Sequence, residues 1–319
     1  MNREKVNLQQ ARDFGETFNA SIKILRQNFK LFFQCLLFLA GPFILLSSIA
    51  GAFYQSNALS MYSPSRIMDM TNLLQQFGLA YLLFIIAAII ANLMIMGTVF
   101  SFLMVYQENG PGNFTVNDVG RTLRQNIGNI LAIFFVFFFI GIVVLALLVG
   151  ILYAIASAVP VLGVLIIVFL FLGILAFCPP FIWQFSVVYL VKMKENKGIF
   201  ESLGKAWDVM RNYFWWTWLI VVCSSIAVGI AGFIFTLPQA AYQMFIAFSN
   251  LRGGTGEVSI PFLMIATVCT FCATLLQGAL HLVNGVHYYS LDEKKDGQGL
   301  MERINEIGNT PVNNVNQHY

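Results

Sequence analysis

Long stretches without a charged residue constrain this chain more than any other feature of its sequence. Lys, Arg, Asp and Glu are absent from Leu31–Met61, Thr71–Tyr106, Ile127–Val191, Tyr213–Leu251 and Val258–Leu291. A membrane-spanning helix needs about 20 mostly apolar residues, and a charge at its centre costs roughly 2.5–3.5 kcal/mol on insertion scales. Charged residues make up only 10% of the chain, against about 25% of a soluble domain. The sequence therefore predicts an all-α polytopic membrane helix bundle.

The charge-free stretches have room for about six transmembrane helices. We expect the spans at Leu31–Phe53, Gly78–Gln107, Gly128–Tyr153, Val161–Val191, Phe214–Leu237 and Ile260–Ser290. The stretch from Ile127 to Val191 is long enough for two spans, and Val159-Pro160-Val161-Leu162-Gly163 supplies the break, because Pro and Gly mark turns. About thirty mostly polar residues precede the first apolar run, which is too long for the core of a secretory signal. We therefore expect an uncleaved membrane anchor.

The distribution of basic residues predicts the orientation. Sixteen of the 18 Lys and Arg residues lie in segments that the six spans place on one side, which are Met1–Lys30, Glu108–Asn126, Lys192–Asn212 and Asp292–Tyr319. The other side carries only Arg66 and Arg252. Because basic residues accumulate in cytoplasmic segments, we expect a multi-pass protein of the inner (plasma) membrane with both termini in the cytoplasm.

An amphipathic segment recurs before three of the spans. Arg26-Gln27-Asn28, Arg124-Gln125-Asn126 and Met210-Arg211-Asn212 each end such a segment and open a span. The apolar stripes are Phe14, Phe18, Ile22, Leu25 and Phe29 in the first, Phe200, Leu203, Trp207, Met210 and Phe214 in the third, and the weaker Val116, Val119, Leu123 and Ile127 in the second. Helices of this kind lie in the membrane interface. Any basic amphipathic segment before a span would look similar, and that is the alternative interpretation.

The recurrence predicts three repeats, each an interfacial helix followed by two spans. On this hypothesis residues 1–30 hold the first amphipathic helix and residues 31–107 hold spans 1 and 2. Residues 108–191 form the second repeat, residues 192–291 the third, and residues 292–319 a cytoplasmic tail.

Aromatic residues gather around the start of the fifth predicted span. They are Trp207, Tyr213, Trp215, Trp216 and Trp218. Trp and Tyr are enriched where a membrane meets water, and they fix the depth of a helix. We interpret these residues as interfacial anchors, with a cage for a ligand as the alternative.

The last predicted span carries a polar face. Gln277, His281, Asn284 and Tyr288 stand at i, i+4, i+7 and i+11, on one side of a helix. Asn92 and Gln184 are further amides within spans. One hypothesis is hydrogen bonding between helices, worth about 0.6 kcal/mol on average, and the other is a face that lines a substrate path. No carboxylate lies in any predicted span to orient a histidine, so we expect no catalytic residue, cofactor or metal site.

The remaining motifs support no further chemistry. The sequence contains no phosphate loop, no dinucleotide fingerprint and no nucleophile elbow. All five cysteines fall inside predicted spans, where a disulfide framework is not expected. The net charge of +3 is small, and we expect no nucleic acid as a partner.

Several segments resemble a known type of membrane protein. They are Arg12-Asp13-Phe14-Gly15-Glu16, Asn28-Phe29-Lys30, Gly41-Pro42, Tyr288-Tyr289-Ser290-Leu291-Asp292-Glu293-Lys294-Lys295, Gly299-Leu300 and Glu302-Arg303-Ile304. Together they resemble uncharacterised bacterial multi-pass proteins and the membrane domain attached to some glycerophosphoryl diester phosphodiesterases, over most of Arg12–Gly308. In those enzymes the chemistry belongs to a separate soluble barrel, so the resemblance implies no catalytic residue in this chain.

The function that these observations favour is not enzymatic. We expect a scaffold or accessory subunit that handles lipids or other membrane proteins within the bilayer. The alternative is a permease for a small or amphipathic solute, with the polar face of the last span lining the path.

Overall fold

The computed structural model describes residues 5–60, 70–158, 160–251 and 260–297, and every regular element in these ranges is helical. Five helical segments are long and apolar enough to cross a membrane: Phe29–Ala58, Gly78–Asn109, Val116–Ala154, Phe214–Ser249 and Ile260–Asp296. The predicted fourth span lies in a further helix, α6, which packs along α5. The prediction of an all-α polytopic membrane helix bundle is confirmed. Arg66, Arg252 and the segment after Gly297 lie outside the described residues.

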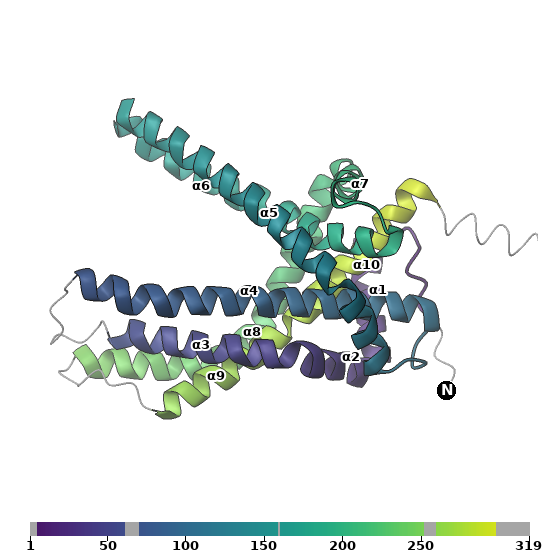
Figure 1. Ribbon diagram of the computed structural model, residues 1–319, viewed down its shortest axis with the longest axis horizontal. Helices are drawn as coiled ribbons and strands as arrows, with labels where there is room; N and C mark the ends of the chain where they lie inside the picture. The colour runs from purple at the N-terminus through teal and green to yellow at the C-terminus, as the bar shows by residue number, and fades with distance from the viewer. Residues whose placement is uncertain (1–4, 61–69, 159, 252–259, 298–319) are drawn as a thin grey trace, which may run out of the picture.

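Figure 1 shows the arrangement of the helices. In chain order they are α1 (Phe14–Gln27), α2 (Phe29–Cys35), η1 (Leu36–Ala40), α3 (Gly41–Ser60), α4 (Met70–Asn109), α5 (Val116–Ala158), α6 (Pro160–Glu195), α7 (Ile199–Arg211), α8 (Phe214–Leu251), α9 (Ile260–Leu275) and α10 (Gln277–Asp296). The α5–α6 hairpin diverges from the other long helices. The helices α1 and α7 and the last turns of α10 gather where the N-terminus lies, which is called the N-terminal end below.

The first predicted span is built from α2, η1 and α3. The segment η1 is a π-helix of five residues, and Gly41 and Pro42 follow it at the start of α3. A proline has no N–H to donate and its ring crowds the carbonyl four residues earlier, here that of Phe38. The wider π turn before Pro42 relieves that crowding while the span stays helical.

Two predicted boundaries are wrong. The amphipathic segment near Asn117–Gln125 is not a separate helix, because α5 runs unbroken for 43 residues. Gly128 stands where the third span was predicted to begin, and a glycine inside a helix costs only about 1 kcal/mol. The fifth span does not end at Leu237, since α8 continues through Pro238 to Leu251. Membrane helices tolerate proline when neighbouring groups satisfy the freed backbone.

The sixth predicted span is divided into α9 and α10 at Leu276. Gly278 lies just after the division, and a Cβ added there would come within 2.5 Å of Leu36 Cδ1 on η1. Gly278 therefore allows η1 to pack closely against the start of α10, and its weak helix propensity favours a break at the same point. In consequence the whole predicted polar face stands on α10.

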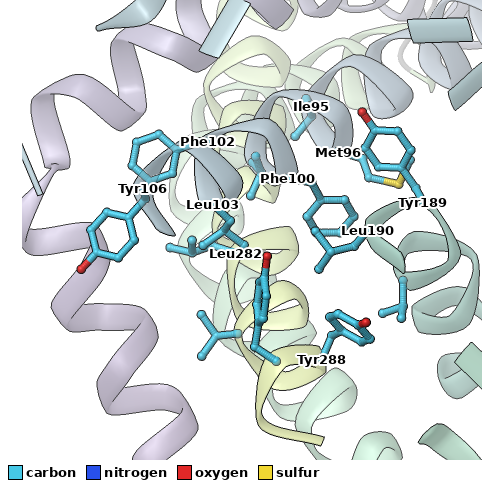
Figure 2. Packing of buried hydrophobic residues seen from close by; sticks show 14 of the residues in the cluster. Ile95, Met96, Phe100, Phe102, Leu103, Tyr106, Tyr189, Leu190, Leu282 and Tyr288 are labelled. Carbon is cyan, nitrogen blue, oxygen red and sulfur yellow. The ribbon is translucent and has the colours of Figure 1, made fainter. Parts of the chain in front are cut away.

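The core lies where α4 meets α10 (Figure 2). Phe100 and Leu103 of α4 are fully buried and contact α10 at Gly285, where a Cβ would come within 2.3 Å of Leu103 Cδ1. Tyr189 of α6 stacks on Phe100 with 6.0 Å between ring centroids. The helix α10 thus occupies the centre of the bundle, with α1, α4, α6 and α8 around it.

The helices α1 and α7 turn small residues toward the protein. Their buried residues are Thr17, Ala20, Ser21 and Ile24 in α1 and Ser202, Ala206, Val209 and Met210 in α7. Of the predicted apolar stripes, Ile22 is 50% and Phe200 74% exposed, whereas Met210 is fully buried. Asp13 and Glu16 form a capping box that fixes the start of α1. Both helices therefore present large apolar side chains to their surroundings.

The segment before α1 crosses the N-terminal end as an ordered strap, formed by residues 5–13. The Val6 amide donates to the Tyr106 hydroxyl at 2.9 Å, and the Arg12 amide donates to Ser290 Oγ at 2.9 Å. The Arg12 guanidinium is buried and donates to the carbonyl of Leu8 at 3.0 Å. These contacts tie the strap to α4 and α10.

Candidate functional site

The polar face of α10 is enclosed by protein. His281 is 6% exposed, Asn284 2% and Tyr288 0%. The His281 ring meets Phe100 of α4 edge-on, with 6.2 Å between centroids. A polar group in hydrocarbon without a partner costs several kcal/mol, so burial against protein is the arrangement that the residue types require.

Few hydrogen bonds from this face join it to other helices. Asn92 of α4 donates from its amide to Gln277 Oε1 at 3.4 Å, so the structure brings these two predicted residues together. Gln184 of α6 is buried at 5% exposure, but no hydrogen bond links it to the α10 face among the described residues. Three polar atoms of the face lack a protein partner in the described part of the chain: His281 Nδ1, Asn284 Oδ1 and Tyr288 Oη. The face therefore holds more donors and acceptors than the neighbouring helices match.

Side chains beside the predicted face extend the polar core. His287 is 1% exposed, and its Nε2 lies 3.1 Å from Thr217 Oγ1 of α8. Trp183 of α6 is fully buried, with its ring centroid 5.5 Å from that of His287. Neither the Trp183 Nε1 atom nor the His287 Nδ1 atom has a protein partner among the described residues.

A cavity of about 620 Å³ lies between α3, α8, α9 and α10, and it is called the glutamine cavity here. Its polar lining consists of Gln55, Ser225, Thr236, Gln239, Gln243, Thr270, Thr274 and Gln277. Gln55 Oε1 accepts hydrogen bonds from the side-chain amides of Gln239 and Gln243, the latter at 2.8 Å. The Thr270 hydroxyl donates to Gln239 Oε1 at 3.3 Å. Of the predicted face only Gln277 reaches this cavity.

A larger cavity of about 1070 Å³ lies at the N-terminal end, and it is called the aromatic cavity here. Its walls are Phe177 and Phe181 of α6, the strap from Ala11 to Asp13, the segment Arg211–Trp216 and Lys294. The Lys294 ammonium lies 5.5 Å from the centroid of the Tyr213 ring and 5.8 Å from that of Trp216. A cation held over two aromatic faces is stabilised by their negative ring potential. The cavity thus combines apolar walls with charged lining residues that sum to a positive charge, namely Arg12, Arg211 and Lys294 against Asp13.

The predicted anchors lie around the aromatic cavity. Trp215 is 66% exposed and Trp207 43% exposed, and the Trp207 ring stacks on Phe181 with 6.3 Å between centroids. The Trp218 ring lies 6.5 Å from that of Trp215. Tyr213 and Trp216 line the cavity itself. Some of the predicted anchors therefore line the aromatic cavity, and others are exposed on the outer surface of the protein.

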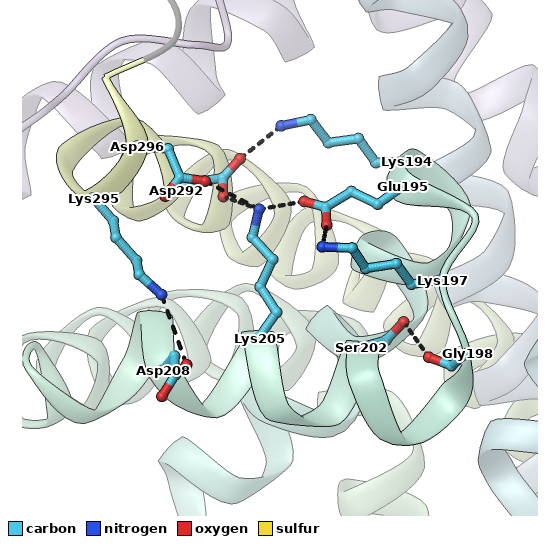
Figure 3. A network of polar contacts seen from close by, with 10 residues as sticks. All are labelled: Lys194, Glu195, Lys197, Gly198, Ser202, Lys205, Asp208, Asp292, Lys295 and Asp296. Atoms are coloured by element: carbon cyan, nitrogen blue, oxygen red, sulfur yellow. Dashed lines mark hydrogen bonds and ion pairs between the residues drawn. The ribbon is translucent and has the colours of Figure 1, made fainter.

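An ion-pair network joins the ends of α6, α7 and α10 (Figure 3). Lys205 of α7 pairs with Glu195 and with Asp292 and Asp296, the last two at 3.1 Å. Lys194 pairs with Asp292 at 2.6 Å. Burial alone would lower the pKa of Lys205, but the carboxylates together raise it above its usual range. The network fixes α7 against the two helices that flank it.

The pKa of Glu195 shows the same balance. Burial opposes ionisation of this carboxyl, but the hydrogen bonds from Lys197 and Lys205 outweigh it and lower the pKa from 4.5. Glu195 therefore stays charged in the folded protein to a lower pH than a free carboxyl would.

No protein-family model, curated protein or solved structure matches this chain. The resemblance to the membrane domain of glycerophosphoryl diester phosphodiesterases thus stays a prediction.

Two groups of cavity residues were missed in the sequence. Gln55, Gln239 and Gln243 follow the predicted ends of their spans and were expected in loops, whereas the helices continue past them. The spacing of Gln239 and Gln243 at i and i+4 is a helical signal that could have found this face. Lys294 was expected in a solvated tail, and only its approach to α8 in space shows its role.

Proposed function

We propose that this chain is a non-enzymatic membrane protein that binds lipid in the aromatic cavity, as a scaffold or accessory subunit that handles lipids or membrane proteins. The observation that carries the proposal is the joint presence of a lysine and apolar walls in one cavity of about 1070 Å³. A phospholipid has the same two parts, because an anionic headgroup adjoins apolar chains.

The charges around the aromatic cavity suit an anionic headgroup. Lys294 makes no ion pair with a described carboxylate, and its ammonium group lies over the rings of Tyr213 and Trp216. The helix α8 begins at Phe214 in the cavity wall, and the first N–H groups of a helix have no acceptor within it. Their partial positive charge attracts anions. Phe177, Phe181 and Trp215 provide surface for an acyl chain.

The proposal includes two further features: the amphipathic helices lie in the membrane interface, and the chain is built from three repeats of one unit. Equivalent positions of the three units are buried alike. Counted from Asp13, Thr115 and Gly198, the fourth residue is fully buried and the eighth is at most 3% exposed. These pairs are Thr17 and Ser21, Val119 and Leu123, and Ser202 and Ala206. Equivalent positions with the same burial support a repeat of the unit, with the outward apolar faces of α1 and α7 resting in lipid.

The orientation of the proposed inner-membrane protein leads to a direct prediction. Because the basic residues gather on one side, reporter fusions at Ser65 and Gly253 should read as external and a fusion at Gly198 as internal. Paired alkaline phosphatase and fluorescent protein fusions measure this in cells. An external reading at Gly198 would contradict both the orientation and the cytoplasmic termini.

Lipid binding is tested by the charge of Lys294. We expect phosphatidylglycerol to raise the melting temperature of the purified protein more than phosphatidylcholine does. The Lys294→Gln variant should bind phosphatidylglycerol about fivefold more weakly, which corresponds to roughly 1 kcal/mol for one basic residue near an anionic headgroup. Titration of each lipid into detergent-solubilised protein, with melting as the readout, gives both affinities.

The control variant is Lys30→Gln, which removes an exposed positive charge outside the aromatic cavity. It should leave the affinity for phosphatidylglycerol unchanged. Equal weakening by Lys30→Gln, or equal stabilisation by both lipids in the unaltered protein, would count against a specific site.

A permease remains the second candidate function, and the glutamine cavity favours it. Gln277, the first residue of the α10 face, lines that cavity and hydrogen bonds to Asn92. His281 and Asn284 line none of the cavities described above and are enclosed by α4 and its neighbours. The polar path therefore includes a cavity at one end only, which is why the lipid proposal ranks first.

A further inference from the structure

The inner face of α8 places small and polar residues in one line along the glutamine cavity. Ser225, Gly229, Gly232, Thr236, Gln239 and Gln243 line it at i, i+4, i+7, i+11, i+14 and i+18. At a rise of 1.5 Å per residue this line is about 27 Å long. It therefore covers most of the roughly 30 Å thickness of a hydrocarbon core.

The opposite wall of the glutamine cavity matches this line with further amides and hydroxyls. Gln55 comes from α3, Thr270 and Thr274 come from α9, and Gln277 comes from α10. In the hydrogen bonds among these glutamines, the side-chain amides of Gln239 and Gln243 donate and Gln55 Oε1 accepts. Gln55 uses its Oε1 atom in both of these bonds, so its amide N–H groups, together with the Thr274 hydroxyl on the same side, are the groups that a ligand would meet.

The lining carries no formal charge. No Asp, Glu, Lys, Arg or His is among its residues, all of which the structure describes. An ion in a membrane cavity needs a counter-charge or a cage of oxygens, because its desolvation is costly. Amides and hydroxyls each donate and accept, so they match an uncharged group with hydroxyls or amides of its own. The volume of about 620 Å³ is in the usual range for small-ligand sites, roughly 300–1,000 Å³.

We infer that the glutamine cavity is a hydrated binding site for an uncharged, hydrogen-bonding solute such as a polyol or a sugar. Direct hydrogen bonds among Gln55, Gln239, Gln243 and Thr270 hold one part of the lining together, and a space of about 620 Å³ is left beside them. An acyl chain is a poor occupant, because it could not match the polar groups of Gln55 and Thr274 that face the space. The site is separate from the aromatic cavity, so it stands or falls independently of lipid binding.

The test compares chemical labelling of two neighbouring positions of α8 at nearly the same depth, one that lines the cavity and one that does not. The background is the full chain with Cys178, Cys223, Cys269 and Cys272 replaced by alanine and the buried Cys35 retained. Both positions are exposed, but Ser225→Cys changes one atom in the wall of the open-sided cavity, whereas Ile226 is next to it and does not line the cavity. In unsealed membranes a charged, water-soluble methanethiosulfonate should label Ser225→Cys at least tenfold faster than Ile226→Cys.

Protection from labelling tests the class of ligand. Glycerol, sorbitol and sucrose are added at increasing concentration, with sodium chloride at matched osmolality as the control. At least one of the three should slow the labelling of Ser225→Cys saturably, several-fold, and sodium chloride should not. The Gln239→Leu variant should abolish that protection while the melting temperature stays near that of the background.

Three outcomes would overturn the inference. Equal labelling at both positions would show that the cavity is not hydrated from its polar side. Labelling without saturable protection by any of the three solutes would show water but no site. Protection by sodium chloride equal to that by the solutes would remove the selectivity for uncharged ligands. None of these outcomes depends on phosphatidylglycerol, so they are separable from failure of the lipid proposal.

Discussion

Replacing Lys205 with methionine is expected to lower the free energy of unfolding by about 2–3 kcal/mol. Removing one partner of a fully buried ion pair costs about 3–5 kcal/mol, because the remaining charge stays desolvated. The Lys205 side chain is 15% exposed and shares three carboxylates, of which Asp292 is 6% exposed. Lys194 still neutralises Asp292 in the variant, so the loss falls somewhat below that range. Equilibrium unfolding of purified protein in mixed micelles measures it.

The matched control removes an exposed charge from the same helix. Arg211 pairs with Asp208 at 3.7 Å, and the two side chains are 60% and 46% exposed. Exposed pairs contribute about 0–1 kcal/mol, so Arg211→Gln should change stability by less than 1 kcal/mol. Similar losses of stability in the two variants would mean that the ion pairs of Lys205 stabilise the fold no more than an exposed pair does.

The same network predicts a dependence on pH. The pKa of Glu195 lies below 4.5 in the folded protein, so its ionised form adds stability above that pH. This contribution is lost as the pH falls through the lower, folded-state pKa. Between about pH 5 and pH 3 the unaltered protein should therefore lose more stability than Glu195→Gln.

The second large effect is expected from Gly285→Leu, which should destabilise the bundle by about 3 kcal/mol or more. A single Cβ at this position would lie 2.3 Å from Leu103 Cδ1 and 3.4 Å from Phe100 Cε1. Both residues are fully buried, so the Leu103 side chain can give way only by displacing the core residues around it. Overpacking a filled core costs about 1–3 kcal/mol, occasionally more, and a leucine adds three further carbons beyond the first contact. Melting in detergent and the yield of folded protein report the change.

Gly141→Leu serves as the comparison, because a Cβ added at Gly141 of α5 would meet no atom within 4 Å. Leucine also has the higher helix propensity, so this variant should melt at or slightly above the temperature of the unaltered protein. Equal destabilisation at the two glycines would indicate a general sensitivity of the helices and not a contact specific to α4 and α10.

Five of the six predicted spans coincide with helices long and apolar enough to cross a membrane, because charge is excluded from lipid whatever the tertiary contacts. Their ends were less predictable, since Pro238 ends a helix in water but not where neighbouring helices supply partners. The continuity of α5 was missed for a related reason, as the amphipathic and apolar patterns meet without a helix breaker between them. The division at Leu276 depends on the approach of Leu36 to Gly278, a contact between residues far apart in the chain.

The sequence predicted which residue types form the polar face of α10, but it did not predict which of them line a cavity. The spacing of Gln277, His281 and Asn284 gave a polar face, and burial of that face follows from its chemistry. Periodicity could not tell which part of it reaches a cavity, because that depends on α8 and α3. Lys294 and Trp216 meet only through the packing of α10 against α8, and no local pattern encodes such a meeting.

The strap has a consequence for the order in which the chain folds. The Arg12 amide reaches Ser290, 278 residues further along, and the first of these leaves the ribosome long before the second. Domains generally form as synthesis proceeds, yet this segment has no complete partner until α10 has been made. A segment that is synthesised before all the described helices is thus among the last to be fixed, and its docking marks the completion of the bundle.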